Sequence, residues 1–323
     1  MHRIFIGLSV GLATALAAAL LPAAAKAQDY PSKPIRVIVP YGPGGNTDIV
    51  ARTIGQKLPD YLGQPVVFDN RGGAAGTLGV SLAAQAPADG YTLVIGDLGS
   101  MVIANHSVPS LPYQTLKDFE PISLVSEVSI AVSVNPESPI RTFADIIQRA
   151  KAQPGKLTYG TGGVGSPGHL AMELLGSIAK VDMLHVPFKG GAQAVTAMIG
   201  GHIDVLVDGT ALAHIKSGRL KAVAVTGPRL PALPDTPGIG DTVPGFSFAN
   251  WWGFLAPAGT PADVVKRLNA AFTQVAELPE VKERLSGLGL TARSGSPADF
   301  ATLLKRETEK VDRIVKSAGI KFQ

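Results

Sequence analysis

Four glycine-containing segments offer the residue types that bind small anions. The first, residues 40–48, reads Pro-Tyr-Gly-Pro-Gly-Gly-Asn-Thr-Asp and lies between a β-branched run and an amphipathic periodic segment. Glycines let the backbone approach a ligand, and the free N–H groups and dipole of a helix N-terminus favour a carboxylate. The candidate ligand contacts here are Tyr41, Gly44, Gly45, Asn46 and Thr47. The alternative is a tight turn in which Asn46 or Thr47 only caps the helix.

The second segment, residues 160–166, also lies between a predicted strand and a predicted helix. Its glycines match the G-x-G-x-x-G pattern of dinucleotide sites. That pattern requires an acidic residue at the end of the next strand, whereas Asp182 precedes that strand. We therefore exclude a nucleotide and expect the loop amides and Ser166 to face a carboxylate. The candidate contacts are Thr161, Gly162, Val164, Gly165, Ser166 and His169.

Two further segments follow predicted strands in the second half of the chain. Both lie where open parallel sheets bind ligands, beyond the carboxyl ends of the strands. Lys189 is either a counter-charge for a carboxylate or a solvated surface residue. The candidate contacts in these segments are Phe188, Lys189, Gly190, Gly191 and Asp208.

Catalytic and metal-binding patterns are absent from the sequence. It contains no G-x-S-x-G, H-E-x-x-H or Walker A motif, and the five histidines after residue 27 have no metal-ligand spacing. The chain has no cysteine, which excludes disulfides, thiolate sites and lipid attachment through a cysteine. We therefore predict no catalytic residue, no metal and no cofactor. The alternative is a secreted hydrolase or isomerase that uses Ser166, His169 and Asp208.

The first 27 residues have the pattern of a cleavable signal peptide. Arg3 supplies the positive charge, residues 4–21 are apolar, and Ala25-Lys26-Ala27 gives a small-x-small cleavage site. We expect cleavage after Ala27 and a periplasmic mature chain. The alternative is an uncleaved membrane anchor, because about 18 apolar residues can span a bilayer.

Removal of 27 residues from a chain of 323 leaves 296, a length that suggests two lobes. Two of the 29 basic residues are removed and none of the 25 acidic ones. The remaining 27 basic and 25 acidic residues give a net charge of +2, which is too low for a typical nucleic-acid-binding protein.

Short β-branched runs alternate with Ala- and Leu-rich segments, which is typical of strand, crossover helix and parallel strand. The predicted strands are residues 35–39, 66–68, 92–95, 157–159, 183–186, 205–207 and 222–226. The predicted helices are residues 46–62 with an interruption at Pro59, 76–86, 142–152, 166–179, 192–199, 262–278 and 297–317. Residues 123–135 are too long for one ordinary strand and suit a passage between two lobes. Trp251-Trp252 indicates core or hinge packing, with contact to the pocket as the alternative.

Taken together, these segments closely resemble the Bug family, the extracytoplasmic solute-binding proteins of tripartite tricarboxylate transporters. The resemblance covers essentially the whole mature chain, and the order and spacing of its motifs make it specific. The motifs lie in residues 30–35, 39–48, 69–76, 89–92, 185–190, 200–204 and 255–261.

The resemblance implies a type II periplasmic-binding-protein fold. Two α/β lobes, each with a mostly parallel central sheet flanked by helices, would be joined by two crossover segments. The lobes would be residues 28–128 plus 250–323, and residues 129–249. By the same resemblance, the lobes close on a small carboxylated solute that loop amides, hydroxyls and ordered waters hold.

We expect such a protein to be a monomer that delivers an organic acid, an amino acid or an aromatic acid to an inner-membrane permease. The alternative is a subunit that presents its closed state to a membrane sensor.

One position departs from the family pattern. Many relatives have a small hydroxyl residue after the strand at 92–95, whereas this chain has Asp97, followed by Ser100; both are candidate contacts. A carboxylate that faced the ligand would repel a second carboxylate by about 1 to 4 kcal/mol. An amino acid or an aromatic monoacid would then be favoured over citrate. In the alternative, Asp97 points to solvent.

Overall fold

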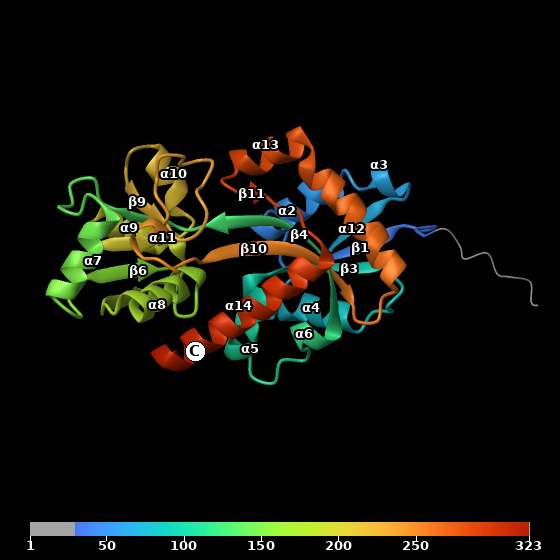
Figure 1. The fold of residues 1–323 in the computed structure, drawn as a ribbon, viewed down its shortest axis with the longest axis horizontal. Helices are drawn as coiled ribbons and strands as arrows, with labels where there is room; N and C mark the ends of the chain where they lie inside the picture. Colours follow the sequence, from blue (N-terminus) through green and yellow to red (C-terminus); the bar gives the residue numbers. More distant parts are fainter. Residues whose placement is uncertain (1–29, 323) are drawn as a thin grey trace, which may run out of the picture.

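Two mixed β-sheets, each flanked by helices, form two lobes that lie side by side along the long axis of the molecule (Figure 1). The computed structural model describes residues 30–322, so the predicted signal peptide lies outside the described residues.

The first lobe contains a six-stranded sheet in the order β11-β4-β10-β3-β1-β2. Its strands are β1 (Ile35–Val39), β2 (Val66–Asn70), β3 (Thr92–Asp97), β4 (Phe119–Ser129), β10 (Ala249–Pro257) and β11 (Thr291–Ala292). β1 pairs in parallel with β2 and β3, whereas β10 is antiparallel to β3 and β4. The loops that follow β1 and β3 therefore lie at the same edge of the sheet.

The second lobe contains a five-stranded sheet in the order β7-β6-β8-β5-β9. Its strands are β5 (Ala131–Val134), β6 (Thr158–Thr161), β7 (Leu184–Pro187), β8 (Val205–Val207) and β9 (Lys221–Val225). β6 is parallel to β7 and β8, which places the segments at 161–166, 188–191 and 208–210 at one edge. The strands predicted from the β-branched runs are confirmed.

Both sheets contain parallel and antiparallel pairs, whereas mostly parallel sheets were expected from the sequence. The parallel pairs are built by consecutive strand-helix-strand units. β10 and β5 enter their sheets from the opposite lobe. β10 therefore pairs antiparallel with β4, and β5 pairs antiparallel with β8 and β9. This arrangement provides the two direct connections between the lobes.

Three helices begin at hydroxyl residues whose side chains satisfy one of the free N–H groups of the first turn. Ser166, Thr142 and Ser296 cap α8, α7 and α14, and the last two form capping boxes with an acid three residues later. The helices of the first lobe are α2 (Asn46–Gly55), α3 (Pro59–Leu62), α4 (Thr77–Ala84), α5 (Ala104–Ser107), α6 (Thr115–Asp118), α12 (Ala262–Glu277), α13 (Pro279–Gly287) and α14 (Pro297–Ala318), with short turns η2 (Ala74–Gly76) and η3 (Gly99–Ile103). Those of the second lobe are α7 (Phe143–Ala152), α8 (Pro167–Ala179), α9 (Gly191–Ile199), α10 (Ala211–Lys216) and α11 (Ile239–Thr242).

Three hydrogen bonds connect the two crossovers, two between backbone groups and one to a side-chain hydroxyl. Thr226 N–H donates to the Ile130 carbonyl, the Ile130 N–H donates to Thr226 Oγ1, and the Phe248 N–H donates to the Thr226 carbonyl at 2.7 Å. Three positions far apart in the sequence therefore form one narrow connection between the lobes, which we call the hinge.

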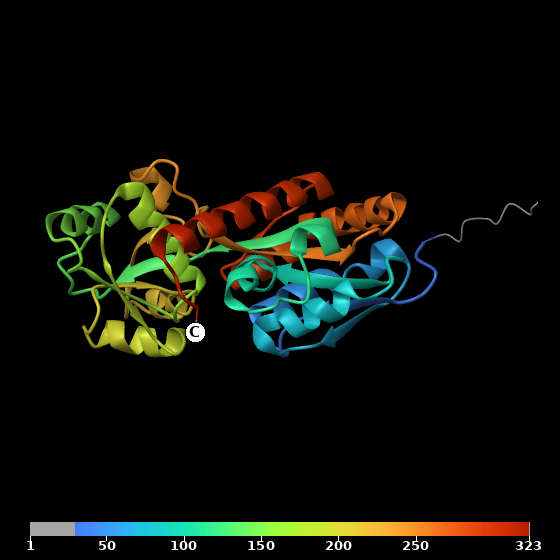
Figure 2. The same cartoon turned by 90° about the horizontal axis from the view of Figure 1, so that it is seen from below.

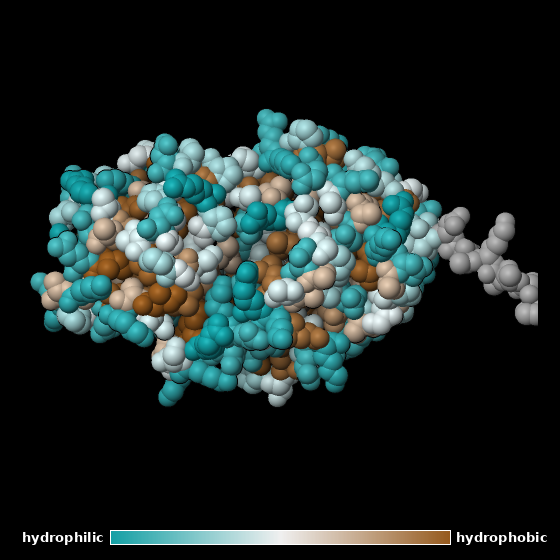
Figure 3. Space-filling view, in the orientation of Figure 1, coloured by the Kyte–Doolittle hydropathy of each residue, from teal (hydrophilic) through white to brown (hydrophobic). Residues whose placement is uncertain are grey.

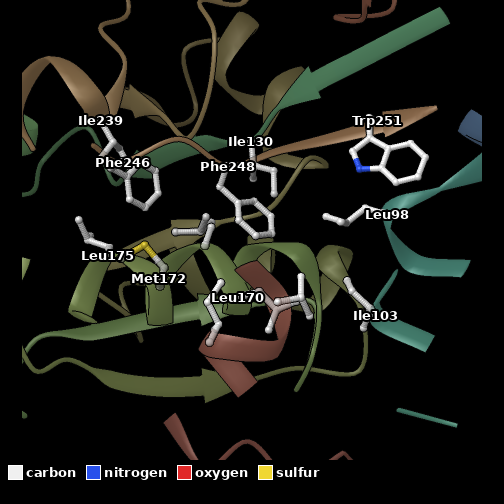
Figure 4. Packing of buried hydrophobic residues seen from close by; sticks show 14 of the residues in the cluster. Leu98, Ile103, Ile130, Leu170, Met172, Leu175, Ile239, Phe246, Phe248 and Trp251 are labelled. Carbon is white, nitrogen blue, oxygen red and sulfur yellow. The ribbon is translucent and has the colours of Figure 1, made fainter. Parts of the chain in front are cut away.

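A continuous apolar cluster extends from one lobe to the other. It includes Leu98 and Trp251 on the side of the first lobe, and Leu170 and Phe246 on the side of the second (Figure 4). Helix α14 runs along this boundary, from its start in the first lobe to α8 in the second (Figure 2). The face shown in Figure 3 is mixed in hydropathy, with hydrophilic side chains over both lobes. Among residues 30–322, no helix has both the length and the apolar character needed to span a bilayer.

Candidate ligand-binding cleft

A cavity of about 420 Å³ lies between the lobes next to the hinge. Asn46, at the first turn of α2, lines it from the first lobe, and Asp208, Gly209 and Thr210 line it from the second. The remaining lining residues are Val128, Ser129, Ile130 and Ala131 of the first crossover, from β4 to β5, with Leu212, Leu230, Leu288, Gly289 and Leu290. The volume is in the range that suits a small solute. Two of the predicted contacts, Asn46 and Asp208, are therefore brought to the same cavity from opposite lobes.

The N-terminus of α2 lies at this cavity and has no side-chain cap. Gly45 is the N-cap residue and makes no side-chain cap, so the expectation that Asn46 or Thr47 caps the helix is wrong. Asp48, in the first turn, accepts a hydrogen bond from the Gly44 N–H at 2.9 Å instead. Gly44 has φ of 85°, a conformation that glycine adopts without strain. The first amides of α2 have no partner within the helix, which leaves them for an anion.

A polar network behind the loop holds Asp48 in place. The Asp48 carboxylate, 4% exposed, accepts hydrogen bonds from Arg52 Nε at 2.9 Å and from Asn70 Nδ2 at 2.9 Å. Asn70 Nδ2 also donates to the Tyr41 carbonyl at 3.0 Å. Burial opposes ionisation, but the hydrogen bonds from Arg52, Gly44 and Asn70 outweigh it and lower the pKa of Asp48. These residues position the first loop, although in the sequence Asp48 and Asn70 are recognisable only as family motif positions.

Asp97 is buried, with 6% of its surface exposed, so it does not point to solvent. Its carboxylate accepts hydrogen bonds from the Ser100 N–H at 2.7 Å and hydroxyl at 2.9 Å, from the Tyr41 hydroxyl at 3.1 Å and from the Thr47 hydroxyl at 3.1 Å. Burial raises its pKa, although these hydrogen bonds act in the opposite direction. Both oxygens thus accept hydrogen bonds from neighbours in the first lobe, so Asp97 is not positioned to repel a second carboxylate of the ligand.

The paired tryptophans are core residues, and each is 2% exposed. Trp252 Nε1 donates to Thr47 Oγ1 at 2.9 Å and so supports the Asp97 network from β10. Trp251 packs edge-on against Phe300 of α14, with 5.5 Å between ring centroids.

The segment after β6 uses its polar side chains internally. Thr161 is fully buried, and its hydroxyl contacts His185 Nε2 at 2.8 Å and donates to the Gly163 carbonyl at 3.1 Å. Ser166 caps α8 through the His169 N–H. Both residues therefore shape the loop, and its exposed surface is formed by backbone and by Val164, which is 39% exposed.

His169 and His185 form a stacked pair beneath this loop. Their ring centroids are 3.9 Å apart, and His185 also stacks on Tyr159. His169 Nδ1 accepts a hydrogen bond from the Gly165 N–H at 3.0 Å, while its Nε2 lies 3.6 Å from Glu173 Oε1. Burial lowers the pKa of both imidazoles, that of His185 to about 4. His169 is therefore a neutral residue that supports the loop, and its partner His185 was not predicted from the sequence.

Asp208 brings a carboxylate directly to the backbone of two neighbouring loops. A Cβ atom at Gly191 would lie 2.2 Å from Asp208 Oδ1, and one at Gly162 would lie 2.9 Å from Oδ2. A larger residue at either position would therefore require the Asp208 side chain to move. Oδ1 accepts hydrogen bonds from the N–H and hydroxyl of Thr210, at 2.9 and 2.7 Å.

The segment after β7 separates into a packed and an exposed part. Phe188 packs against the apolar cluster of α9 and β8, so its ring is turned toward the interior of the lobe. Lys189 is exposed, and within the described part of the chain its side chain makes no ion pair. Gly190 and Gly191 form the start of α9, where free amides again face the edge of the sheet.

The hydrolase alternative is not supported by the geometry. The Ser166 hydroxyl meets the backbone of His169, the His169 ring meets Gly165 and Glu173, and Asp208 bonds to Thr210. The three side chains therefore form no nucleophile-base-acid chain. Among residues 30–322, no cluster of three or more His, Asp or Glu side chains could hold a metal ion.

Two mixed α/β lobes, joined by two crossovers and carrying helix N-termini at a shared cleft, define the periplasmic-binding-protein fold. The family model described as "Tripartite tricarboxylate transporter family receptor" matches residues 50–320, and the chain belongs to this family. It is a family of transport receptors and not of enzymes.

Individual relatives agree with this assignment. The chain is 32% identical to protein BugT of Bordetella pertussis, over 100% of this chain and 99% of that one. It is also similar to a Rhodopseudomonas palustris protein, Rpa4515, solved with adipate, at 32% identity and a TM-score of 0.73 over 91% of this chain and 100% of that one. MatC from the same species, solved with bound malate, is 32% identical with a TM-score of 0.69 over 88% and 100% of the two chains.

Proposed function

We propose that this chain is a periplasmic receptor that captures a small carboxylate-bearing solute between its lobes by hinge closure and delivers it to a membrane permease. The observation that carries the proposal is the cavity at which the start of α2 and the segment after β8 meet from opposite lobes. The starts of α8 and α9 lie at the same edge of the second sheet. Helix N-termini on both sides of a carboxylate bind it more tightly when the lobes are closed than when they are open. This difference in affinity between the two states is what allows the ligand to drive closure.

The relatives solved with adipate and malate support a carboxylate ligand for this chain as well. The positions of the acids refine the ligand class. Asp97 is saturated with hydrogen bonds, whereas Asp208 lines the cavity with one oxygen, Oδ2, that accepts no hydrogen bond from the described residues. We infer a ligand with one carboxylate and a hydrogen-bond donor at its other end, such as a hydroxy acid or an amino acid.

The remaining parts of the proposal follow from the sequence analysis. The mature receptor would begin after Ala27 and act as a monomer in the periplasm. Its lobes would be residues 28–128 plus 250–323 and residues 129–249, with the hinge at Ile130, Thr226 and Phe248. The alternative is that the closed state binds a membrane sensor and not a permease. Deletion of the gene would distinguish the two, because it would abolish uptake of the solute in the first case and only signalling in the second.

A thermal-shift panel tests solute capture. The mature protein is mixed with malate, adipate, ω-amino acids and α-amino acids, each at millimolar concentration. A ligand at about one hundred times its Kd stabilises the folded state by about 2.7 kcal/mol, which corresponds to a rise in Tm of about 5 to 10 °C. 1,6-Hexanediol, which has the six-carbon chain of adipate but no carboxylate, serves as the negative control. If no carboxylate raises the Tm, the proposal is wrong.

A further inference from the structure

The chain beyond α14 turns back between the two lobes (Figure 2). Helix α14 packs on Trp251 through Phe300 in its first turn, and it ends at Ala318, followed by Gly319 in a left-handed conformation. The Ile320 N–H donates to the Val315 carbonyl, and Ile320 and Phe322 both pack against the apolar cluster shared by the lobes. The segment is therefore a packed part of the fold.

The ring of Phe322 lies directly against Gly165 of the second lobe. A Cβ atom at Gly165 would be 2.2 Å from Phe322 Cε1 and 2.5 Å from Cδ1. Real Cβ atoms do not approach other atoms so closely, so the aromatic ring occupies the space that any larger residue would need. Gly165 is buried, and its φ of 76° is also unfavourable for residues with a side chain.

Gly165 is held from a second direction as well. Its N–H donates to His169 Nδ1 at 3.0 Å, and the next amide, that of Ser166, donates to the Gly163 carbonyl at 3.2 Å. The ring of Phe322 and the ring of His169 therefore fix the same residue, one by packing and the other by a hydrogen bond.

We propose that Phe322 is a positioning residue that holds the ligand segment at 162–166 in its binding conformation. Phe322 touches no ligand in this proposal; it acts through Gly165. Because it follows a helix that starts in the first lobe, it also ties a ligand segment of the second lobe to the first. The effect on ligand affinity rests on the proposed function, whereas the positioning of the segment does not.

A double-mutant cycle tests the contact without a ligand. In the wild-type background, Gly165→Ala introduces both backbone strain and a clash with the ring; in the Phe322→Ala background only the strain remains. We expect Gly165→Ala to lower the Tm by about 3 to 6 °C more in the first background than in the second. Equal shifts in the two backgrounds would overturn the proposal.

Gly201→Ala is the matched control for this cycle. Gly201 lies in the second lobe with φ of 72°, and a Cβ atom there meets nothing within 4 Å. Its substitution introduces similar backbone strain without a clash, so its effect on Tm should be the same with and without Phe322. A dependence of Gly201→Ala on Phe322 equal to that of Gly165→Ala would show a general loss of stability and would also overturn the proposal.

Hydrogen exchange measured by mass spectrometry distinguishes positioning of residues 162–166 from a general loss of stability, because a general loss would not affect one peptide selectively. We expect Phe322→Ala to accelerate exchange in the peptide that covers residues 162–166 by at least about tenfold, which corresponds to about 1.4 kcal/mol of local stability. The peptide that covers residues 40–48 should be unchanged, and Phe322→Tyr, which keeps the ring, should restore slow exchange. Equal acceleration in both peptides would contradict positioning.

Titration with malate and adipate separates this proposal from the proposed function. If either compound binds the wild type, Phe322→Ala should weaken its binding about tenfold and Phe322→Tyr should restore it. An unchanged Kd for Phe322→Ala would overturn the positioning role. If neither compound nor any other carboxylate binds the wild type, the proposed function fails, and the cycle and the exchange experiment still decide whether Phe322 positions the segment.

Discussion

The hydroxyl group of Tyr41 donates a hydrogen bond of 3.1 Å to the buried carboxylate of Asp97, from a loop 56 residues earlier in the chain. Thr47 and Ser100 donate to the same carboxylate. Burial and the negative charge of Asp97 raise the pKa of Tyr41, so its hydroxyl keeps the proton that it donates. The loops after β1 and β3 are thus joined through one side chain.

Replacing Asp97 should therefore destabilise the first lobe. Asp97→Ala leaves the Tyr41, Thr47 and Ser100 donors without their acceptor, and we expect it to lower the free energy of unfolding by about 2 to 4 kcal/mol. Asp97→Asn keeps the shape and one acceptor, and should cost less. Urea denaturation of both variants measures the difference. A free energy for Asp97→Ala within about 0.5 kcal/mol of wild type would show that the carboxylate does not organise these loops.

Substitution of Asp208 should change ligand preference rather than stability. Its carboxylate lines the cleft cavity, where a negative charge repels a second ligand carboxylate. We expect Asp208→Asn to tighten the binding of malate or adipate about tenfold and to weaken that of amino acids, as measured by isothermal titration calorimetry.

Asp182→Asn provides the control for this experiment. It removes the same charge from an exposed residue of the second lobe, at the other end of β7, and should leave both affinities unchanged. If Asp182→Asn tightens dicarboxylate binding as much as Asp208→Asn does, net charge and not the position of Asp208 decides the preference.

The strands could be predicted because parallel strands covered on both faces are continuous apolar runs. β8 illustrates this, since Val205, Leu206 and Val207 are all fully buried. The elements that were missed have weak local signals. α13 follows α12 after a single residue, Leu278, and β11 is only two residues long and exists through its pairing with β4.

The candidate site could be predicted at the level of loops but not of side chains. The four glycine-containing segments lie at the facing edges of the two sheets because parallel strands end on the same side. Which side chains point into the cleft depends on distant partners: Asp97 meets Tyr41, and Thr161 meets His185. Such tertiary hydrogen bonds leave no periodic pattern in the sequence.

The His169–His185 pair makes stability depend on pH. The unfolded chain protonates His185 below a pH of about 6.5, whereas the folded chain does so only near its pKa of about 4. The unfolded state therefore binds more protons in this window, and the pair's contribution to stability is lost as the pH falls from 6.5 to 4. His169, whose pKa is also lowered by burial, acts in the same direction.

His185→Gln should reduce the change in the free energy of unfolding between pH 4.5 and 7 by about 1 to 3 kcal/mol. This range allows for solvent screening of the partly exposed ring. Glutamine can still reach the Thr161 hydroxyl but does not titrate. Tyr159, Glu173 and His169 are the ionisable groups that face or adjoin His185, and they remain in the variant. Urea denaturation at pH 4.5 and 7 measures the slope. If the free energy of unfolding changes equally with pH in wild type and His185→Gln, the folded protein does not hold His185 as a half-buried neutral imidazole.

Asp48 supports the first ligand loop from behind, and its removal should affect both stability and binding. Asp48→Ala leaves the Gly44 N–H, Arg52 and Asn70 without their shared acceptor, which we expect to lower the free energy of unfolding by about 2 to 4 kcal/mol. Without the Asp48 carboxylate, the loop that carries the backbone amides of residues 44–47 is no longer fixed. The affinity for any carboxylate that binds the wild type should therefore fall about tenfold or more. Asp60→Ala, an exposed acid in the first turn of α3, should change the free energy of unfolding by less than about 0.5 kcal/mol and leave affinity unchanged. Because Asp48 is not among the residues that line the cleft cavity, a loss of affinity confined to Asp48→Ala would establish that the geometry of the loop, and not only its presence, is required for binding.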